Sequence, residues 1–155
     1  MSNYIKIERV PYEEPYHVQL NWEISNGNIF SRFEYYDNTD SLIRMAENLE
    51  QFPKHSSDVF LYEIGSEKLE DNFAYYFRFR LFTPDAFGHS AIQIKFCNNN
   101  VLPYREMAEF CIRAEPAAIN SLGKLLREFA KLEKEYLVWS ETDSFIGGKY
   151  EYEYA

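Results

Sequence analysis

The alternation of polar and apolar residues over Phe73–Cys97 constrains the fold of this chain more than any other stretch. Every second residue of Phe73–Leu81 is large and apolar, and the same holds for Ile92–Phe96. A period of two is typical of strands with one buried face. Between the two runs lies Thr83–Gly88, in which proline and glycine favour a turn. The stretch therefore predicts a β-hairpin at the centre of an antiparallel sheet.

The other face of this hairpin carries basic residues. We expect Phe79 to stand opposite Ile92, because both belong to the apolar face, and this register places Arg78 opposite Gln93. Residues 73–114 include five basic and three acidic residues, whereas the whole chain has a formal charge of −9. Basic residues are therefore concentrated in this part of an acidic chain.

Two interpretations of the basic face remain open. It could be an anion-binding strip for a phosphate, a carboxylate or an acidic partner segment, because guanidinium groups bind such anions through paired hydrogen bonds. It could instead be a solvated face on which the cations form cross-strand ion pairs with Glu109, Glu23 or Glu34. For the first interpretation, the candidate anion-binding residues are Arg78, Arg80, Lys95, His89 and Arg113.

The remaining periodicity predicts an α+β fold. Two amphipathic helices are expected, one over residues 41–52 that Pro53 stops, and one that starts at Pro116 and carries an apolar stripe as far as Leu132. Besides the hairpin, strands are expected at Tyr4–Val10, Val18–Ile24, Ile29–Tyr36, Asp58–Ile64 and Tyr104–Glu115, with Tyr136–Trp139 as a further candidate edge strand. The expected architecture is one bent, mainly antiparallel sheet of about seven strands with the two helices against it, in the order β-β-β-α-β-β-β-β-α.

The length and composition of the chain suit a single domain. It has 155 residues, of which 46% are hydrophobic, so it can bury a core without metal or disulfide cross-links. We expect this domain to span residues 1–146. A tail over residues 147–155 follows, in which tyrosines alternate with charged residues. Such a tail is typically frayed, although its alternation would also allow it to pair with a sheet edge and join copies of the protein.

The charge of the chain indicates which partners it would avoid. With 25 acidic against 16 basic residues, it should avoid nucleic acid and anionic membranes and could attract a basic partner. No apolar run approaches the roughly 18 residues of a membrane span, and the N-terminus lacks a secretory leader pattern, so we expect a cytoplasmic protein. Cys97 and Cys111 are expected to be reduced thiols, because paired strands would hold them too far apart for a disulfide.

Acidic residues concentrate on the first expected helix and its flanks. They could form a solvated helix face, or a docking surface at which complementary charge speeds encounter with a basic protein. Exposed tyrosines would strengthen the second interpretation, and Tyr35, Tyr36 and Tyr62 are the candidates nearby. The candidate partner-binding residues are Glu47, Glu50, Asp58, Glu63, Tyr36 and Tyr62.

No motif in the chain specifies a reaction. The loop of the central hairpin carries Asp85, His89 and Ser90, which are residue types used in general-base catalysis. Neither a G-x-S-x-G elbow nor an H-E-x-x-H pair accompanies them. We therefore expect Asp85 to cap its own turn and His89 to be a polar residue at a strand start. No cofactor or metal site is expected, since neither cysteine lies in a C-x-x-C pair.

The run FRFRLFTPDAFGHSAIQIKF, a following strand and the run AAINSLGKLLREF together resemble small bacterial proteins over residues 40–129. Some of these are immunity proteins of contact-dependent polymorphic toxin systems, including those paired with wall-associated toxins. The resemblance brings no catalytic motif, and it implies a non-catalytic cytoplasmic protein that binds and blocks a cognate toxin. An acidic protein would then match a basic toxin domain. The alternative is a protein that binds, or acts on, a small anionic ligand at the basic face. The oligomeric state stays open.

Overall fold

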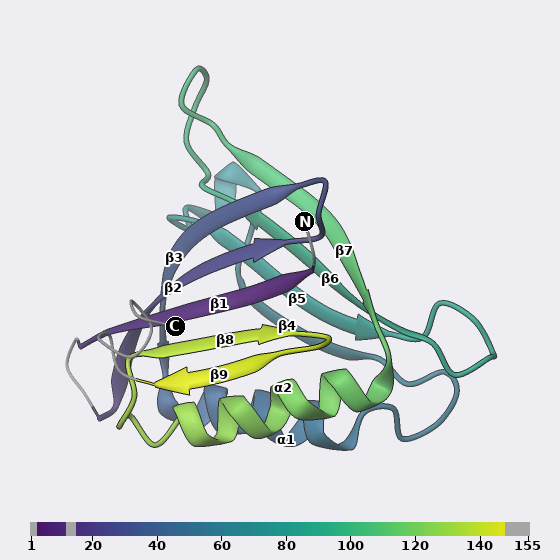
Figure 1. The fold of residues 1–155 in the computed structure, drawn as a ribbon. Helices are drawn as coiled ribbons and strands as arrows, with labels where there is room; N and C mark the ends of the chain where they lie inside the picture. Colours follow the sequence, from purple (N-terminus) through teal and green to yellow (C-terminus); the bar gives the residue numbers. More distant parts are fainter. Residues whose placement is uncertain (1–2, 12–14, 148–155) are drawn as a thin grey trace. The chain divides into compact units, whose positions relative to one another are not determined.

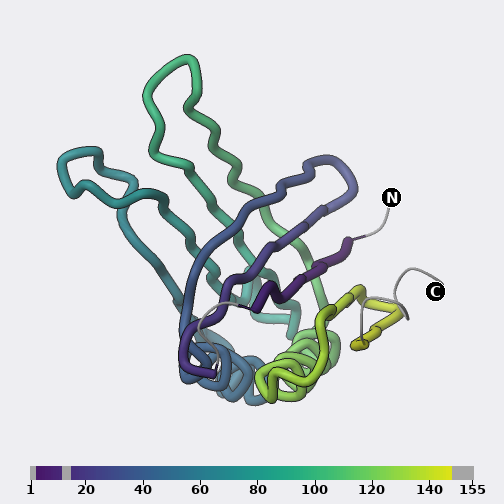
Figure 2. The backbone as a smooth tube through the Cα atoms, turned by 90° about the vertical axis from the view of Figure 1, so that its left-hand side faces the viewer, coloured from purple at the N-terminus to yellow at the C-terminus, as the bar shows by residue number. Residues whose placement is uncertain are grey.

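The computed structural model describes residues 3–11 and 15–147 (Figure 1, and Figure 2 after a quarter turn). Within these ranges the structure contains two α-helices, one short 3-10 helix and nine strands, in the order β-β-β-α-β-β-β-β-α-β-β. All paired strands are antiparallel, which confirms the expected α+β class. No helix in the described ranges is long and apolar enough to cross a membrane.

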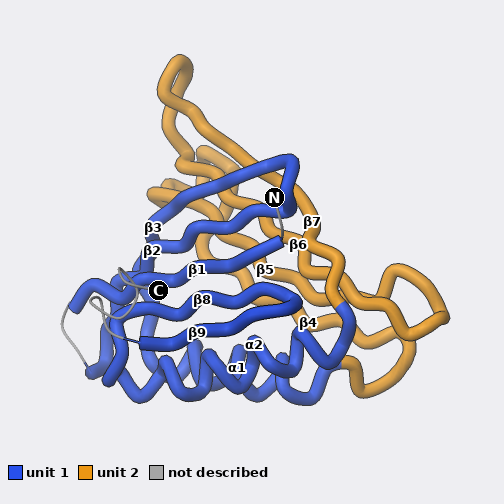
Figure 3. Tube along the Cα trace, in the orientation of Figure 1, with its two compact units in different colours: residues 1–52, 115–155 blue, residues 53–114 orange. Residues whose placement is uncertain are grey.

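Residues that lie close together in space group the chain into two compact units (Figure 3). The first unit comprises Met1–Phe52 and Glu115–Ala155, and the second comprises Pro53–Ala114. Each unit contains one sheet, so the strands form two sheets rather than the single bent sheet that we expected. The expectation was wrong because alternation along a strand reports which face is buried, and not which strands are neighbours.

The sheet of the first unit has the strand order β3-β2-β1-β8-β9. Its strands are β1 (Tyr4–Pro11), β2 (His17–Ser25), β3 (Phe30–Asn38), β8 (Tyr136–Ser140) and β9 (Ser144–Gly147). One face is buried, and it includes Ile5, Ile7, Leu20, Trp22, Phe33 and Tyr35. β8 lies between β1 and β9, so it is not the edge strand that we expected, and the sequence pattern did not indicate β9. The tail beyond residue 147 lies outside the described residues.

The two α-helices of the first unit, α1 (Thr39–Gln51) and α2 (Pro116–Phe129), confirm both predicted helices and lie side by side (Figures 1 and 2). Asn38 caps α1, because its Oδ1 accepts a hydrogen bond from the backbone N–H of Ser41 at 2.9 Å. The buried stripes are Leu42, Met45, Ala46 and Leu49 of α1, and Ile119, Leu122, Leu126 and Phe129 of α2. α2 ends before the predicted limit at Leu132, which has a left-handed φ of 61°.

The sheet of the second unit has the strand order β4-β5-β6-β7. Its elements are β4 (Phe60–Gly65), the 3-10 helix Leu69–Asp71, β5 (Tyr76–Phe82), β6 (Ser90–Cys97) and β7 (Met107–Ala114). The buried face includes Phe77, Phe79, Leu81, Ile92, Ile94, Phe110 and Ile112. The central hairpin, now β5–β6, is thereby confirmed. Cys97 and Cys111 remain thiols, as expected.

The register of the β5–β6 hairpin differs by two residues from the one that we expected. Phe79 stands opposite Ile94 rather than Ile92, and Arg78 stands opposite Lys95. A shift of two residues keeps every side chain on its own face, so the apolar alternation cannot distinguish these registers. The length of the connecting loop decides between them, and the hydrophobic pattern does not specify it.

Candidate functional site

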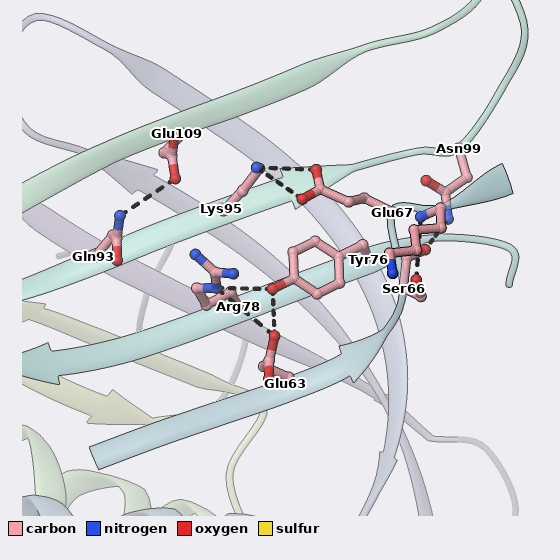
Figure 4. Close-up of polar contacts among 10 residues, drawn as sticks. Glu63, Ser66, Glu67, Tyr76, Arg78, Gln93, Lys95, Asn99 and Glu109 are labelled. Carbon is pink, nitrogen blue, oxygen red and sulfur yellow. Dashed lines mark hydrogen bonds and ion pairs between the residues drawn. The ribbon is translucent and has the colours of Figure 1, made fainter. Parts of the chain in front are cut away.

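The outer face of the second unit's sheet carries a row of four charged residues (Figure 4). Glu63 of β4, Arg78 of β5, Lys95 of β6 and Glu109 of β7 stand opposite one another in successive strands. Arg78 and Lys95 are like charges at directly opposite positions, which destabilises a strand pair unless other charges compensate. The carboxylates at the two ends of the row have the sign needed for that compensation.

A buried tyrosine joins Arg78 and Glu63 at one end of this row. The hydroxyl of Tyr76 donates a hydrogen bond to Oε2 of Glu63 at 2.5 Å and accepts one from Nε of Arg78 at 2.8 Å. Nε of Arg78 also lies 3.8 Å from Oε2 of Glu63. Burial of Tyr76, together with its bond to Glu63, raises the pKa of the hydroxyl to about 12, although Arg78 opposes the shift. Tyr76 is therefore a neutral hydrogen-bond donor at physiological pH.

Lys95 is paired with a carboxylate from outside the row. Its Nζ lies 2.9 Å from Oε2 and 3.1 Å from Oε1 of Glu67, which belongs to the loop after β4. Asn99, after β6, holds this loop, because its Nδ2 donates a hydrogen bond to the carbonyl of Ser66 at 2.7 Å. Only 16% of the Lys95 side chain is exposed, so little of its charge faces solvent.

Arg80 and Arg113 lie on the same sheet but outside the row. Nη1 of Arg80 donates to Oε1 of Gln93 at 3.3 Å, and its guanidinium lies 4.5 Å from the centre of the Phe82 ring. Gln93 in turn donates to Oε2 of Glu109 at 3.3 Å. Arg113 is exposed near the far end of β7. The guanidinium of Arg80 is thus held by neighbours on its own sheet.

His89 belongs to the turn of the hairpin and not to the charged row. Its Nδ1 lies 2.7 Å from Oδ2 of Asp85, and Oδ1 of Asp85 accepts a hydrogen bond from the backbone N–H of Phe87 at 2.8 Å. The bond from His89, followed by the bond from Phe87, holds the pKa of the Asp85 carboxyl below its usual value. Asp85 therefore caps its own turn, as the sequence predicted.

These contacts agree with the second interpretation of the basic face, in which its cations form ion pairs, but the acidic partners differ in part from those that we expected. Glu63 and Glu67, which we did not name as partners of the cations, contact them directly. Of the three glutamates that we named, Glu109 does stand opposite Lys95 and accepts from Gln93, whereas Glu23 and Glu34 belong to the first unit. Glu23 pairs there with Arg32 at 3.1 Å. An anionic ligand at Arg78 or Lys95 would have to compete with a carboxylate that is already in place.

The candidate partner-binding residues are distributed over both units. In the first unit, Glu47 is exposed on α1, and Glu50 forms an ion pair with Arg127 of α2 at 2.5 Å. The hydrogen bond from Arg127 holds the pKa of Glu50 below its usual value, although partial burial opposes it. Tyr36 of β3 is 46% exposed, and its hydroxyl donates to Oε1 of Glu34 at 3.2 Å. Glu47 and Tyr36 are therefore available on the surface.

Asp58 and Glu63 lie in the second unit, where both carboxylates have local partners. Oδ2 of Asp58 accepts a hydrogen bond from the backbone N–H of Lys54 at 2.8 Å, and Oδ1 lies 4.0 Å from Nε2 of His55. Glu63 is held by Tyr76 as described above. Local hydrogen-bond donors therefore already occupy part of the acceptor capacity of both carboxylates.

Two of the three tyrosines that we named as candidates for an exposed docking surface are buried. Tyr62 is 5% exposed, and its ring contacts Phe77 edge-on with 6.4 Å between ring centres. Tyr35 is fully buried. Both residues lie on the inward face of a half-buried strand, so neither side chain can serve as a surface anchor.

A cluster of exposed apolar side chains lies in the connection between β6 and β7, for which we named no candidate residue from the sequence. Val101, Leu102 and Tyr104 in this loop are 67%, 81% and 70% exposed. We call these three residues the apolar tip. Figure 1 shows the loop extending beyond the ends of its two strands. Contiguous patches of exposed apolar side chains often mark interaction sites in soluble proteins. The available signal was the run Val-Leu-Pro-Tyr after three consecutive asparagines.

One asparagine holds the base of this loop. The backbone N–H of Asn98 donates to the carbonyl of Glu106 at 3.0 Å, and its Oδ1 accepts from the N–H groups of Glu106 and Asn100 at 3.0 and 3.1 Å. Its Nδ2 donates to the carbonyl of Tyr104 at 2.9 Å. The N–H of Tyr104 donates to the carbonyl of Val101 at 2.8 Å. The loop is therefore ordered by hydrogen bonds although the side chains at its end are exposed.

Among the residues that the structure describes, no group of three or more histidine, cysteine, aspartate or glutamate side chains is arranged to hold a metal ion. In comparisons with known proteins, no family model matches the chain, and no curated protein and no solved structure matches it significantly.

Proposed function

We propose that this chain is a non-catalytic binding protein that inserts the apolar tip into a cleft of a partner protein and thereby blocks it. The observation that carries the proposal is the exposure of Val101, Leu102 and Tyr104 at the end of a hydrogen-bonded loop. Burying one aliphatic side chain of this size contributes about 1.5–3 kcal/mol. Because Asn98 already orders the base of the loop, binding would lose less conformational entropy than it would with a flexible loop.

The partner that we infer is a protein with an apolar cleft and a basic surface. The formal charge of −9 would attract such a protein over a long range and speed encounter. Residues 98–106 contribute one arginine and one glutamate, so the loop itself has no net charge. Short-range contact would then be apolar. This combination fits an immunity protein that occludes the site of a basic toxin domain in the cytoplasm, which is the role that the sequence resemblance implies.

Binding of a small anion at the basic face is the weaker candidate. Arg78 is engaged by Tyr76 and Glu63, and Lys95 is engaged by Glu67. A ligand would have to displace these carboxylates and leave them without their cations, which costs free energy. No observation at this face favours a ligand over the carboxylates already there.

Affinity capture with two matched variants tests the proposal. Leu102→Ser removes the most exposed side chain of the apolar tip, and Phe87→Ser removes an apolar side chain that is 85% exposed in the β5–β6 loop of the same unit. Each tagged protein is incubated with lysate of the source organism, and retained proteins are compared by mass spectrometry at low and high salt. We expect wild type and Phe87→Ser to retain one common partner at both salt concentrations, and Leu102→Ser to lose it.

A functional assay completes the test. The chain, added in equimolar amount to the captured partner, should inhibit the activity of that partner, and Leu102→Ser should not. Retention of the partner by Leu102→Ser would overturn the proposal. So would a partner that high salt releases, because surface charge contacts are screened by salt whereas apolar contacts are not.

A further inference from the structure

β3 forms one edge of the five-stranded sheet, and it lacks most of the features that protect edge strands. It pairs with β2 at nine consecutive positions without a bulge, and it contains no proline or glycine. Natural edge strands are commonly short, bulged or interrupted by proline, because an open edge recruits other strands. Within the described residues, no other strand pairs with the outer side of β3. A long and regular edge of this kind is a candidate for pairing with another chain.

The exposed face of β3 has a self-complementary pattern. Phe30 and Tyr36 are 47% and 46% exposed, and between them Arg32 and Glu34 are exposed with opposite charges. These four residues are arranged symmetrically about Phe33. Turning the strand end over end about that residue exchanges the arginine with the glutamate and one aromatic ring with the other.

The backbone of the same four residues is directed to the edge. Two hydrogen bonds flank the β2–β3 ladder, from the N–H of Asn26 to the carbonyl of Ile29 at 3.2 Å and from the N–H of Thr39 to the carbonyl of Tyr16 at 3.3 Å. Bonded and non-bonded pairs alternate in an antiparallel ladder. Odd-numbered residues of β3 therefore face β2 with their backbone groups, and even-numbered residues face the edge.

We propose that two copies of the protein pair antiparallel along β3, about a two-fold axis through Phe33, and so join their sheets. In this register Arg32 stands opposite Glu34 of the second copy, and Phe30 stands opposite Tyr36 of the second copy, each pair occurring twice. Moving the axis to Arg32 or to Glu34 would place like charges opposite each other, which destabilises paired strands. Charge complementarity therefore favours a second copy of the protein as the strand that pairs with β3, and it also favours the register centred on Phe33.

Existing contacts of the two charged residues are compatible with this pairing. Arg32 contacts Glu23 at 3.1 Å, yet 71% of its side chain is exposed. A guanidinium has five N–H donors, so Arg32 can keep Glu23 and also bind Glu34 of the second copy. Glu34 accepts from the hydroxyl of Tyr36 through Oε1, and a carboxylate can accept several hydrogen bonds.

Charge-reversed variants test this pairing by sedimentation over a range of protein concentrations. Wild type should reach twice the monomer mass of 18.5 kDa. Arg32→Glu places two acids opposite each other and Glu34→Arg places two bases opposite each other, so each variant alone should be monomeric. Mixing the two variants restores opposite charges at both contacts and should yield a heterodimer with one copy of each. Glu47→Arg, an equal charge change on the exposed side of α1, should leave the dimer unchanged.

Three results would overturn the pairing: a wild type that is monomeric at every concentration, single variants that stay dimeric, or a mixture that stays monomeric. Circular dichroism establishes that the variants are folded. If either charge-reversed variant is unfolded, hydrogen exchange of the wild-type protein replaces the sedimentation test. The backbone amides of Arg32 and Glu34 should then exchange more slowly at high than at low protein concentration. Equal exchange at low and high concentration would refute the pairing. Leu102→Ser should remain dimeric, so this test is independent of the proposed function.

Discussion

Gly123 lies at the contact between α2 and α1, and its replacement by alanine tests how closely the two helices pack. A Cβ atom at this position would lie 2.7 Å from the backbone nitrogen of Glu50 and 2.9 Å from the carbonyl oxygen of Ala46. Both are backbone atoms of α1, so neither can rotate away. Because non-bonded carbon contacts are comfortable at about 3.5–4.0 Å, the helices would have to separate by about 1 Å.

One favourable and two unfavourable contributions to the free energy of unfolding set the size of the effect. Replacing glycine by alanine within a helix gains about 1 kcal/mol. Overpacking a close contact costs about 1–3 kcal/mol. Separating the helices also strains the bonds from Nδ2 of Asn120 to the carbonyls of Leu49 and Phe52, at 2.8 and 2.9 Å, each of which is worth about 1 kcal/mol. We therefore expect Gly123→Ala to lower the free energy of unfolding by about 2 kcal/mol.

Urea unfolding followed by circular dichroism measures this difference. The matched control is Lys124→Ala, which changes the exposed neighbouring residue of the same helix and should alter stability by less than about 0.5 kcal/mol. A Gly123→Ala variant as stable as wild type, or more stable, would refute the close packing of α1 and α2. The gain in helix propensity from alanine would then equal or exceed any cost of overpacking at this contact.

Two further predictions concern one polar side chain in each unit, Asn120 in the first and Tyr76 in the second. Asn120→Ala removes one hydrogen bond from each of the carbonyls of Leu49 and Phe52, although the Leu49 carbonyl keeps the bond from the N–H of Phe52, and it should cost about 1–3 kcal/mol in urea unfolding. Asn48→Ala, which removes a bond to the carbonyl of Arg44 within α1, should cost less than about 0.5 kcal/mol. Equal losses for the two variants would contradict a link between the helices. The folded-state pKa of Tyr76, about 12, exceeds its ordinary value of 10.0, so this residue adds stability below pH 10 that is lost as the pH rises to about 12. The free energy of unfolding of Tyr76→Phe should therefore fall less between pH 10 and pH 12 than that of wild type. Equal falls for Tyr76→Phe and wild type would contradict this contribution of Tyr76.

The sequence predicted those parts of the fold that depend on local periodicity. The cap at Asn38 and the stripe from Leu42 to Leu49 lie within one segment, so nothing distant is needed to recognise α1. Likewise, the alternation of Phe77 and Phe79 with charged residues sufficed to assign the buried face of β5. Local spacing and side-chain polarity carried each of these predictions.

The sequence could not predict relations between distant segments. A shift of two residues leaves Phe79 on the same face, so the register of β5–β6 had no signature in the alternation. Glu67, the partner of Lys95, comes from a loop whose path depends on the Asn99 bond to the carbonyl of Ser66. For the same reason the basic face and its opposing Glu109 could be recognised in the sequence, while Glu63 and Glu67, which contact the cations directly, could not.

Exposure of loop residues was a further limit. Val-Leu-Pro-Tyr reads equally well as a buried or an exposed turn, and only the surroundings of Leu102 show that its side chain is 81% exposed. The opposite error occurred at Tyr62, which lies near acidic residues in sequence but faces inward. Candidate sites chosen by residue type alone therefore missed the apolar tip and included a buried tyrosine.

The most direct test of the central claim is the dissociation constant of the captured partner, measured by titration calorimetry with wild type, Leu102→Ser and Phe87→Ser. If the apolar tip carries the binding energy, Leu102→Ser should lose about 2 kcal/mol of binding free energy, which corresponds to a dissociation constant roughly 30-fold larger. Phe87→Ser should bind as wild type does. Equal dissociation constants for all three proteins would contradict the account, because binding would then not depend on the apolar tip.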